Sequence, residues 1–273
     1  MYSFIPLTLL LALLLATAHA QAPRDSRVPG GVAVLQVAKI DAPKPTVLYN
    51  GMRTWVTRNG EAWVAVVGLP LSLQAGEHSV SVTQDNVTAA QKFTVAAKRY
   101  PLQKLTLNKA MVDPPQEVME RIERESLHVA TVRSQWRETE ATLGTFTLPA
   151  QGRLSSRFGV ARVLNGKPRS PHAGLDVAVG VGTPIHAPAD GVVLDAGDYY
   201  YCGKTLFIDH GNGLITMNCH LSEFTAKVGD SVKRGQAVAL SGGTGRATGP
   251  HLHWSVFLNG VSVEPELFLT AKK

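Results

Sequence analysis

The sequence has 273 residues, of which 44% are hydrophobic and 18% are charged. This composition excludes an intrinsically disordered chain, and the length favours two domains. Two cysteines exclude a disulfide-dense scaffold and a four-cysteine zinc site. The formal net charge of +6 suits a polyanionic partner, which could be a nucleic acid, an anionic lipid or an anionic cell-wall polymer.

An almost wholly apolar run opens the chain, from Phe4 to Ala16. It is shorter than the roughly 20 residues that a bilayer-spanning helix needs. It ends at Ala18-His19-Ala20, which fits the small-x-small pattern of signal peptidase cleavage. We therefore expect residues 1–20 to be a removed signal peptide, with an uncleaved membrane anchor as the alternative. We therefore expect an exported protein, periplasmic or extracellular, which does not have a nucleic acid as its partner. Disulfides can form in that compartment.

Residues 21–100 are predicted to form a small β-sandwich-like domain. Short runs of β-branched and aromatic residues, typical of strands, alternate with turn signals such as Asn59-Gly60. Repeated short strands favour a small sandwich or barrel. We expect a binding or spacer domain, with strands over residues 32–37, 54–57, 63–67, 78–83 and 92–95.

Residues 101–145 are expected to be a linker with a helix over 114–143. Asp113 is a suitable N-cap, and Pro114 suits the first helical position. Apolar residues that end with Trp136 form one stripe at helical spacing, and glutamate and arginine cover the other face. We expect the helix to connect the two domains and to pack on one of them.

Residues 146–273 are predicted to form an antiparallel β-sheet domain. Turn signals such as Asn165-Gly166 and Gly211-Asn212-Gly213 separate short strands, and no helical crossover for a parallel sheet is visible. The expected fold class is therefore mainly β, with a small N-terminal sandwich-like domain, a linking α-helix and a C-terminal antiparallel sheet.

Six of the nine histidines lie between positions 172 and 253, beside an aspartate. In an extended segment His172, Gly174 and Asp176 share one side, and the glycine leaves room between two ligating side chains. Imidazole nitrogen and carboxylate oxygen are proper ligands for zinc. Both imidazoles of His251-Leu252-His253 face one side of a strand, and His220 comes from another strand.

These residues carry a resemblance to a known family. His172-x-x-x-Asp176, a later His220-Leu221 and Gly249-Pro250-His251-Leu252-His253 resemble, in this order, the lysostaphin-type (LytM-like) zinc endopeptidases. The resemblance covers roughly residues 146–268. That family cleaves peptide bonds in bacterial peptidoglycan, so the resemblance implies a zinc metallopeptidase domain whose partners are peptidoglycan peptide stems. The sequence does not set the oligomeric state, and we expect a monomer.

The resemblance also implies roles for individual residues. His172, Asp176 and His253 match the zinc ligands, which implies one Zn²⁺ per chain, and His220 and His251 match the catalytic histidines. Three protein ligands leave a fourth position for water, as catalytic zinc requires. We expect His251 to be the general base and His220 to stabilise the developing oxyanion, although the sequence does not separate these two roles.

Three further residues are expected to bind substrate. Arg246 lies in the glycine-rich loop before His251, where it is able to meet a substrate carboxylate. Many family members carry an aromatic residue two positions before the histidine that corresponds to His220, and this chain has Asn218 there. Tyr201 is one of three consecutive tyrosines that are expected to line the groove instead.

A disulfide is predicted between Cys202 and Cys219. If residues 201–219 form a hairpin, pairing about its turn matches residues whose numbers sum to about 421 or 422, and these two cysteines sum to 421. Neighbouring strand positions fall within disulfide range, and the exported compartment is oxidising. Two reduced thiols, or Cys219 as an extra zinc ligand, are the alternatives.

Two other functions compete with this interpretation. A non-catalytic member of the same family would bind peptidoglycan or regulate other wall enzymes, but such proteins usually lack some of the five site residues. A lipoyl- or biotin-like carrier would explain the segment from Val228 to Gln236, but Lys204 has no exposed hairpin setting and the histidines would be left without a role.

Overall fold

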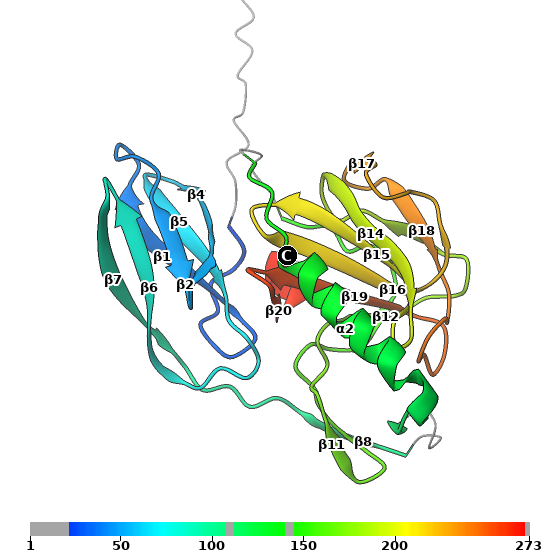
Figure 1. The fold of residues 1–273 in the computed structure, drawn as a ribbon. Coiled ribbons are helices and arrows are strands. Elements are labelled where there is room, and N and C mark those ends of the chain that lie inside the picture. Colours follow the sequence, from blue (N-terminus) through cyan, green and yellow to red (C-terminus); the bar gives the residue numbers. More distant parts are fainter. Residues whose placement is uncertain (1–21, 107–111, 140–144, 271–273) are drawn as a thin grey trace, which may run out of the picture.

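We describe the fold from a computed structural model, which describes residues 22–106, 112–139 and 145–270 (Figure 1). The expected signal peptide lies outside these residues. Within them, no helix has both the length and the apolar character that crossing a membrane requires.

The N-terminal domain is a sandwich of two antiparallel sheets. One sheet has the order β1-β5-β4 and the other β3-β2-β6-β7. The expected strands are all present, and the mainly β fold class is confirmed. The strands are β1 (Val32–Lys39), β2 (Thr46–Tyr49), β3 (Met52–Arg53), β4 (Trp55–Asn59), β5 (Ala62–Gly68), β6 (Gly76–Gln84) and β7 (Val87–Val95).

The β1-β5-β4 sheet is buried on both faces. Val67 and Val56 pack inside the sandwich, whereas Val66, Val64 and Trp55 pack on the core of the C-terminal domain. Burial on both faces accounts for the nearly continuous apolar run of β5, because neither face has to be polar. The N-terminal domain is thus one layer of a shared core.

The linker contributes a strand as well as a helix. β8 (Leu102–Leu105) pairs in parallel with β10 (Ala161–Leu164), which forms a hairpin with β11 (Lys167–Arg169). We call these three strands the accessory sheet; it lies below the end of the helix in Figure 1.

The helix is shorter than predicted. A 3₁₀ turn η1 (Gln116–Val118) precedes α2 (Met119–Arg133), so the predicted helix is wrong over residues 134–139, and residues 140–143 lie outside the described residues. Beyond it, the Nε of Arg137 donates to Asp209 at 2.6 Å, and Trp136 lies against Gly213. These contacts with the C-terminal sheet hold the segment extended where the apolar spacing alone favours a helix.

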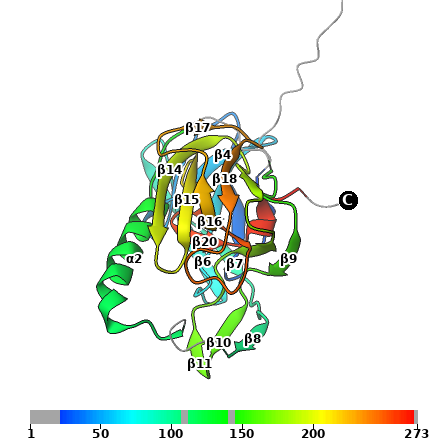
Figure 2. The ribbon, with the colours of Figure 1, turned by 90° about the vertical axis from the view of Figure 1, so that its right-hand side faces the viewer.

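The C-terminal domain is built on one large, mainly antiparallel sheet with the central order β17-β14-β15-β16-β19-β12-β9 (Figure 2). Strands β13, β18 and β20 pair at its sides. Its strands are β9 (Arg153–Ser156), β12 (Leu175–Ala178), β13 (Pro184–His186), β14 (Gly191–Tyr199), β15 (Gly203–Gly211), β16 (Leu214–Phe224), β17 (Ser231–Val232), β18 (Ala237–Ser241), β19 (Leu252–Leu258) and β20 (Val261–Val263), and a 3₁₀ turn η2 (Pro265–Phe268) follows.

The two faces of this sheet pack against different parts of the protein. Leu252 and Trp254 of β19 point into the core shared with the N-terminal domain. Phe257 points to the other face, where Val132 of α2 and Cys219 join it in a smaller cluster. The alternation of β19 therefore places His253 on the α2 face.

The predicted disulfide is absent from the structure, which has Cys202 and Cys219 as free cysteines. The register behind the prediction was also wrong. The β15-β16 hairpin turns at Asn212-Gly213, so its pairs, such as Leu206 with Asn218, sum to 424 or 425. The cysteines are consequently not cross-strand partners.

Candidate active site

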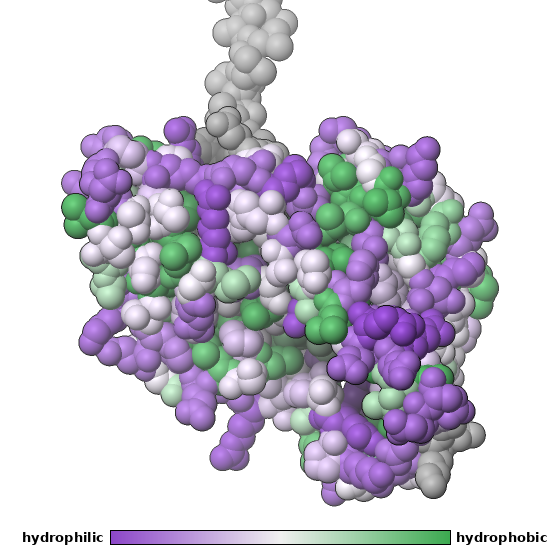
Figure 3. Space-filling view, viewed as in Figure 1, coloured by the Kyte–Doolittle hydropathy of each residue, from purple (hydrophilic) through white to green (hydrophobic). Residues whose placement is uncertain are grey.

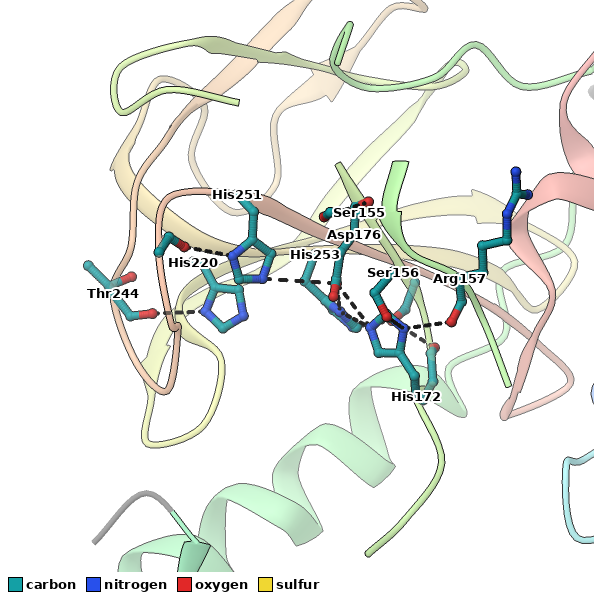
Figure 4. A network of polar contacts seen from close by, with 12 residues as sticks. Ser155, Ser156, Arg157, His172, Asp176, His220, Thr244, His251 and His253 are labelled. Carbon is teal, nitrogen blue, oxygen red and sulfur yellow. Dashed lines mark hydrogen bonds and ion pairs between the residues drawn. The ribbon is translucent and has the colours of Figure 1, made fainter. Parts of the chain in front are cut away.

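Three ligating atoms converge at one point of the α2 face (Figure 4). The Nε2 of His172 lies 2.9 Å from Oδ1 of Asp176 and 3.0 Å from Nδ1 of His253, and the latter two atoms lie 2.8 Å apart. We call these three atoms the ligand triangle. Asp176 and His253 meet because they are directly paired between β12 and β19. The structure thus brings together the three residues predicted to bind metal.

Hydrogen bonds on the far side of each imidazole fix which nitrogen faces the triangle. The Nδ1 of His172 lies 2.8 Å from the carbonyl oxygen of Arg157, an acceptor, so Nδ1 carries the proton. The hydroxyl of Ser255 donates to the carbonyl of Ala173 and therefore accepts from Nε2 of His253 at 2.9 Å. Both triangle nitrogens are left with a lone pair.

The carboxylate completes an anionic set of ligands. Burial raises the pKa of Asp176, whereas His172 and His253 lower it when they carry a proton towards the carboxylate. With both nitrogens unprotonated, a bound metal ion would supply that positive charge instead. Three lone pairs within 3.0 Å of one another repel unless a cation lies among them. Two imidazole nitrogens and one carboxylate oxygen fit zinc, and they leave a fourth tetrahedral position open.

Gly174 has the role expected from its spacing. A Cβ there would lie 2.6 Å from Cε1 of His253 and 2.7 Å from Oγ of Ser255. Any larger residue would push the imidazole of His253 and the side chain of Ser255 out of place. Gly174 is therefore needed for His253 to reach the ligand triangle.

His220 reaches the site through a distorted strand. Cys219 pairs directly with His253, so a regular β16 would send the next side chain to the opposite face. His220 instead has a φ of +60°, a left-handed conformation, and its N–H donates to the carbonyl of Cys202 at 2.8 Å. This irregularity turns the imidazole onto the metal face, where it lies 4.6 Å from the ring of His251.

Both catalytic candidates present an unprotonated nitrogen to the pocket. The Nδ1 of His220 donates to the carbonyl of Thr244, and that of His251 to the carbonyl of Gly249, each at 2.8 Å. Burial lowers the pKa of His220 to about 4, so the ring is neutral at pH 7. In this state Nε2 of His220 accepts a hydrogen bond, and the expected donation to an oxyanion requires it to gain a proton first.

A pocket of about 210 Å³ opens beside these residues, and two of the three expected substrate-binding residues line it. The guanidinium of Arg246 lies 4.4 Å from the ring centroid of Tyr201. Asn218 is different: it is 0% exposed, because it points into the shared core beside Trp254 and Leu206, its strand partners. The expectation that Asn218 contacts substrate was therefore wrong.

Sequence reasoning missed Arg162 and Leu105, which also line the pocket. Both come from the accessory sheet. The Asn165-Gly166 turn does indicate the β10-β11 hairpin. Nothing local indicates that β8 pairs with it, because that pairing joins segments nearly sixty residues apart.

Comparison with known proteins supports the two-part organisation. The sequence profile of peptidase family M23 matches residues 170–265, and that of the family's N-terminal domain matches residues 25–98. These matches confirm the family resemblance seen in the histidine motifs.

Among curated proteins, the peptidoglycan DD-endopeptidase ShyA of Vibrio cholerae is 40% identical over 116 residues, which is 42% of this chain and 27% of that protein. The DD-carboxypeptidase/endopeptidase Mpg of Neisseria meningitidis is 43% identical over 94 residues, 34% of this chain and 22% of that protein. The alignments thus span about a quarter of the length of these relatives.

One solved structure matches nearly the whole chain. A crystal structure from Pseudomonas aeruginosa, described as an M23 peptidase, is 38% identical, covers 91% of this chain and 97% of its own, and has a TM-score of 0.77. Since this likeness extends over both domains, the protein belongs to peptidase family M23.

Proposed function

We propose that this protein is a zinc-dependent endopeptidase that hydrolyses peptide crosslinks of bacterial peptidoglycan. The observation that carries the proposal is the convergence of three lone pairs beside two unprotonated imidazole nitrogens in one pocket. The names of ShyA and Mpg support the substrate class. The substrate lies outside the cytoplasm, in agreement with the signal peptide expected over residues 1–20.

His172, Asp176 and His253 would hold the metal, one ion per chain. Zinc bound there would polarise the scissile carbonyl and lower the pKa of a water molecule. Asp176 offers its negative charge through Oδ1, and the protons on the far nitrogens of the two imidazoles are held by Arg157 and Ser255.

His251 is the general base of this proposal. In the neutral tautomer that donates from Nδ1 to Gly249, its Nε2 has the free lone pair and lies 3.9 Å from Oδ1 of Asp176, beside the ligand triangle. It accepts the proton of the attacking water and delivers it to the leaving amine. His220 lies against it and would stabilise the developing oxyanion through Nε2, taking the proton for that hydrogen bond from solvent as the negative charge builds up.

Two classes of substitution separate metal binding from proton transfer. Replacing His172, Asp176 or His253 with alanine is expected to remove zinc and activity together, because each change removes one ligand. Replacing His220 or His251 with alanine is expected to abolish activity and retain one zinc per chain. Zinc is measured by elemental analysis, and activity by digestion of purified sacculi with mass spectrometry of the new termini.

His186→Ala is a matched control, because this histidine bonds to the carbonyl of Pro149 and does not line the pocket. It should keep both zinc and activity. A zinc-loaded wild-type protein that releases no new termini would instead favour the non-catalytic, peptidoglycan-binding alternative. Loss of zinc from His251→Ala but not from His253→Ala would reverse the ligand assignment.

A further inference from the structure

Arg162 is a half-buried cation with few contacts that compensate its charge. Its side chain is 27% exposed, and its Nε has no hydrogen-bond partner among the described residues. The nearest carboxylate oxygen to Nη2 is Oδ2 of Asp176, at 3.8 Å, which is too far for a hydrogen bond. A guanidinium taken out of water normally forms short, paired contacts with an anion.

A second guanidinium faces the same pocket. Arg246 lies over the ring of Tyr201, and its backbone N–H donates to the carbonyl of Tyr201 at 2.9 Å, so the loop is anchored at this point. Burial lowers the pKa of Arg162, the charge of Asp176 raises it, and the charge of Arg246 lowers it again, so the two cations repel each other. A bound anion would relieve that repulsion.

The charge balance of the pocket points the same way. Among the described residues that line it, Asp176 is the only carboxylate, and its Oδ1 belongs to the ligand triangle. With a divalent metal in place, the metal and Asp176 together carry about one positive charge, to which the two arginines add. Such a pocket attracts a substrate that brings its own negative charge.

We propose that Arg162 and Arg246 form a subsite for a carboxylate of the peptide substrate, next to the scissile bond. The inference rests on the proposed function and specifies its substrate further. Where the carbon that bears the scissile nitrogen also bears an unamidated carboxyl group, a free carboxylate lies next to the bond that is cut. This subsite would hold that carboxylate while Leu105 and Leu164 of the accessory sheet border the pocket with apolar surface.

The test compares two crosslinked peptide dimers that differ in one group. One has the free carboxylate on the carbon next to the scissile nitrogen, and the other has a primary amide there. The zinc-loaded wild-type enzyme should cleave the acid with a kcat/KM roughly 10- to 100-fold above that for the amide, as expected for losing a charged hydrogen bond. Equal rates for the two dimers would overturn the subsite, and this comparison needs no variant.

Variants then assign the effect to the arginines. Arg162→Gln and Arg246→Gln should each lower cleavage of the acid dimer towards that of the amide dimer and slow the amide dimer much less, with zinc retained. Arg169→Gln is the matched control, because Arg169 lies on the paired strand β11 and bonds to Asp113. If the Arg162→Gln protein loses zinc, or cleaves both dimers equally slowly, then Arg162 acts only by positioning Asp176. The proposal would then be wrong.

Binding separates this inference from the proposed function. Calorimetry with both dimers measures affinity even when no cleavage occurs. A wild-type protein that cleaves neither dimer but binds the acid more tightly would contradict the proposed peptidase and support the subsite. Equal affinity for the two dimers would overturn the subsite.

Discussion

Ser255 determines which nitrogen of a metal ligand faces the ligand triangle. Its hydroxyl donates to the carbonyl of Ala173 and accepts from Nε2 of His253. Without that acceptor, the proton of His253 is free to move to Nδ1, where it would oppose a metal ion. The serine is fully buried, so no bulk water replaces it.

Ser255→Ala is therefore expected to weaken zinc binding by about 10- to 100-fold, the usual effect of removing a partner of a ligating histidine. Competition with a chromophoric chelator measures the affinity. Ser231→Ala, an exposed serine on β17, is the control and should bind zinc as the wild type does. Equal zinc affinity in the two variants would show that the tautomer of His253 does not depend on Ser255.

The metal ligands could be predicted from the sequence because strand alternation is a local rule. Spacing and residue type indicated a histidine and aspartate cluster, and the family resemblance singled out His172, Asp176 and His253 as its ligands. Ser255 obeys the same alternation relative to His253, but a serine has too many roles for its position alone to indicate this one. Arg162 could not be predicted, because its place beside Asp176 depends on how the accessory sheet folds back.

At the scale of elements, the glycine-rich loop over residues 242–250 packs against the start of β15. The contact is between Gly245 of the loop and Gly203 of the strand. Gly203 has a φ of +61° and Gly245 one of +70°. A Cβ on Gly203 would lie 2.3 Å from the carbonyl carbon of Thr244, and one on Gly245 would lie 2.2 Å from the nitrogen of Gly203. That approach places the carbonyl of Thr244 where it accepts from Nδ1 of His220.

Gly203→Ala or Gly245→Ala is expected to push the loop away and release His220, with zinc retained. A displacement of about 1 Å at a catalytic group reduces turnover by about 100-fold. Gly243→Ala is a control in the same loop, because a Cβ there meets no atom within 4 Å. Digestion of sacculi and zinc content measure the two effects. If Gly203→Ala is as active as Gly243→Ala, the close packing does not position His220.

Errors in predicting elements arose where tertiary contacts override local pattern. The apolar stripe extends the helix to Trp136, but Arg137 bonds to Asp209 and the helix ends at Arg133. The hairpin register differs because the turn lies at Asn212-Gly213, later in the chain than the predicted pairing required. Neither the left-handed conformation of His220 nor its cause is visible in a strand-like sequence.

At the scale of the whole molecule, the two domains are joined by more than a linker. The side-chain amide of Asn259 bonds to both the N–H and the carbonyl of Gly68, at 2.6 and 3.3 Å. Arg53 bonds to Glu138 and lies over the ring of Trp136, after α2. On the face of the molecule that Figure 3 shows, hydrophilic residues are interspersed with several hydrophobic patches.

This shared core changes how the N-terminal domain can be studied. Deleting residues 21–100 would expose the apolar residues of the C-terminal domain that pack on Trp55, Val64 and Val66. A truncated protein would then report lost stability together with any lost regulation. Single substitutions at the N-terminal residues that pack on the C-terminal core instead measure how the two domains are coupled within the intact chain.

Trp55→Ala is expected to destabilise both domains together. Trp55 is 2% exposed and belongs to the shared core, and replacing a buried tryptophan with alanine costs about 3–5 kcal/mol. Urea unfolding followed by circular dichroism and by loss of peptidase activity should give one transition that moves to lower urea with both probes. Trp63→Ala is the matched control, because Trp63 is half-buried at the sandwich core and donates to the carbonyl of Ala42.

This control variant should shift the unfolding midpoint less than Trp55→Ala does, since Trp63 does not pack on the catalytic domain. If Trp55→Ala shifts circular dichroism in a separate early transition and leaves the activity midpoint unchanged, the domains unfold independently and the shared layer does not couple them.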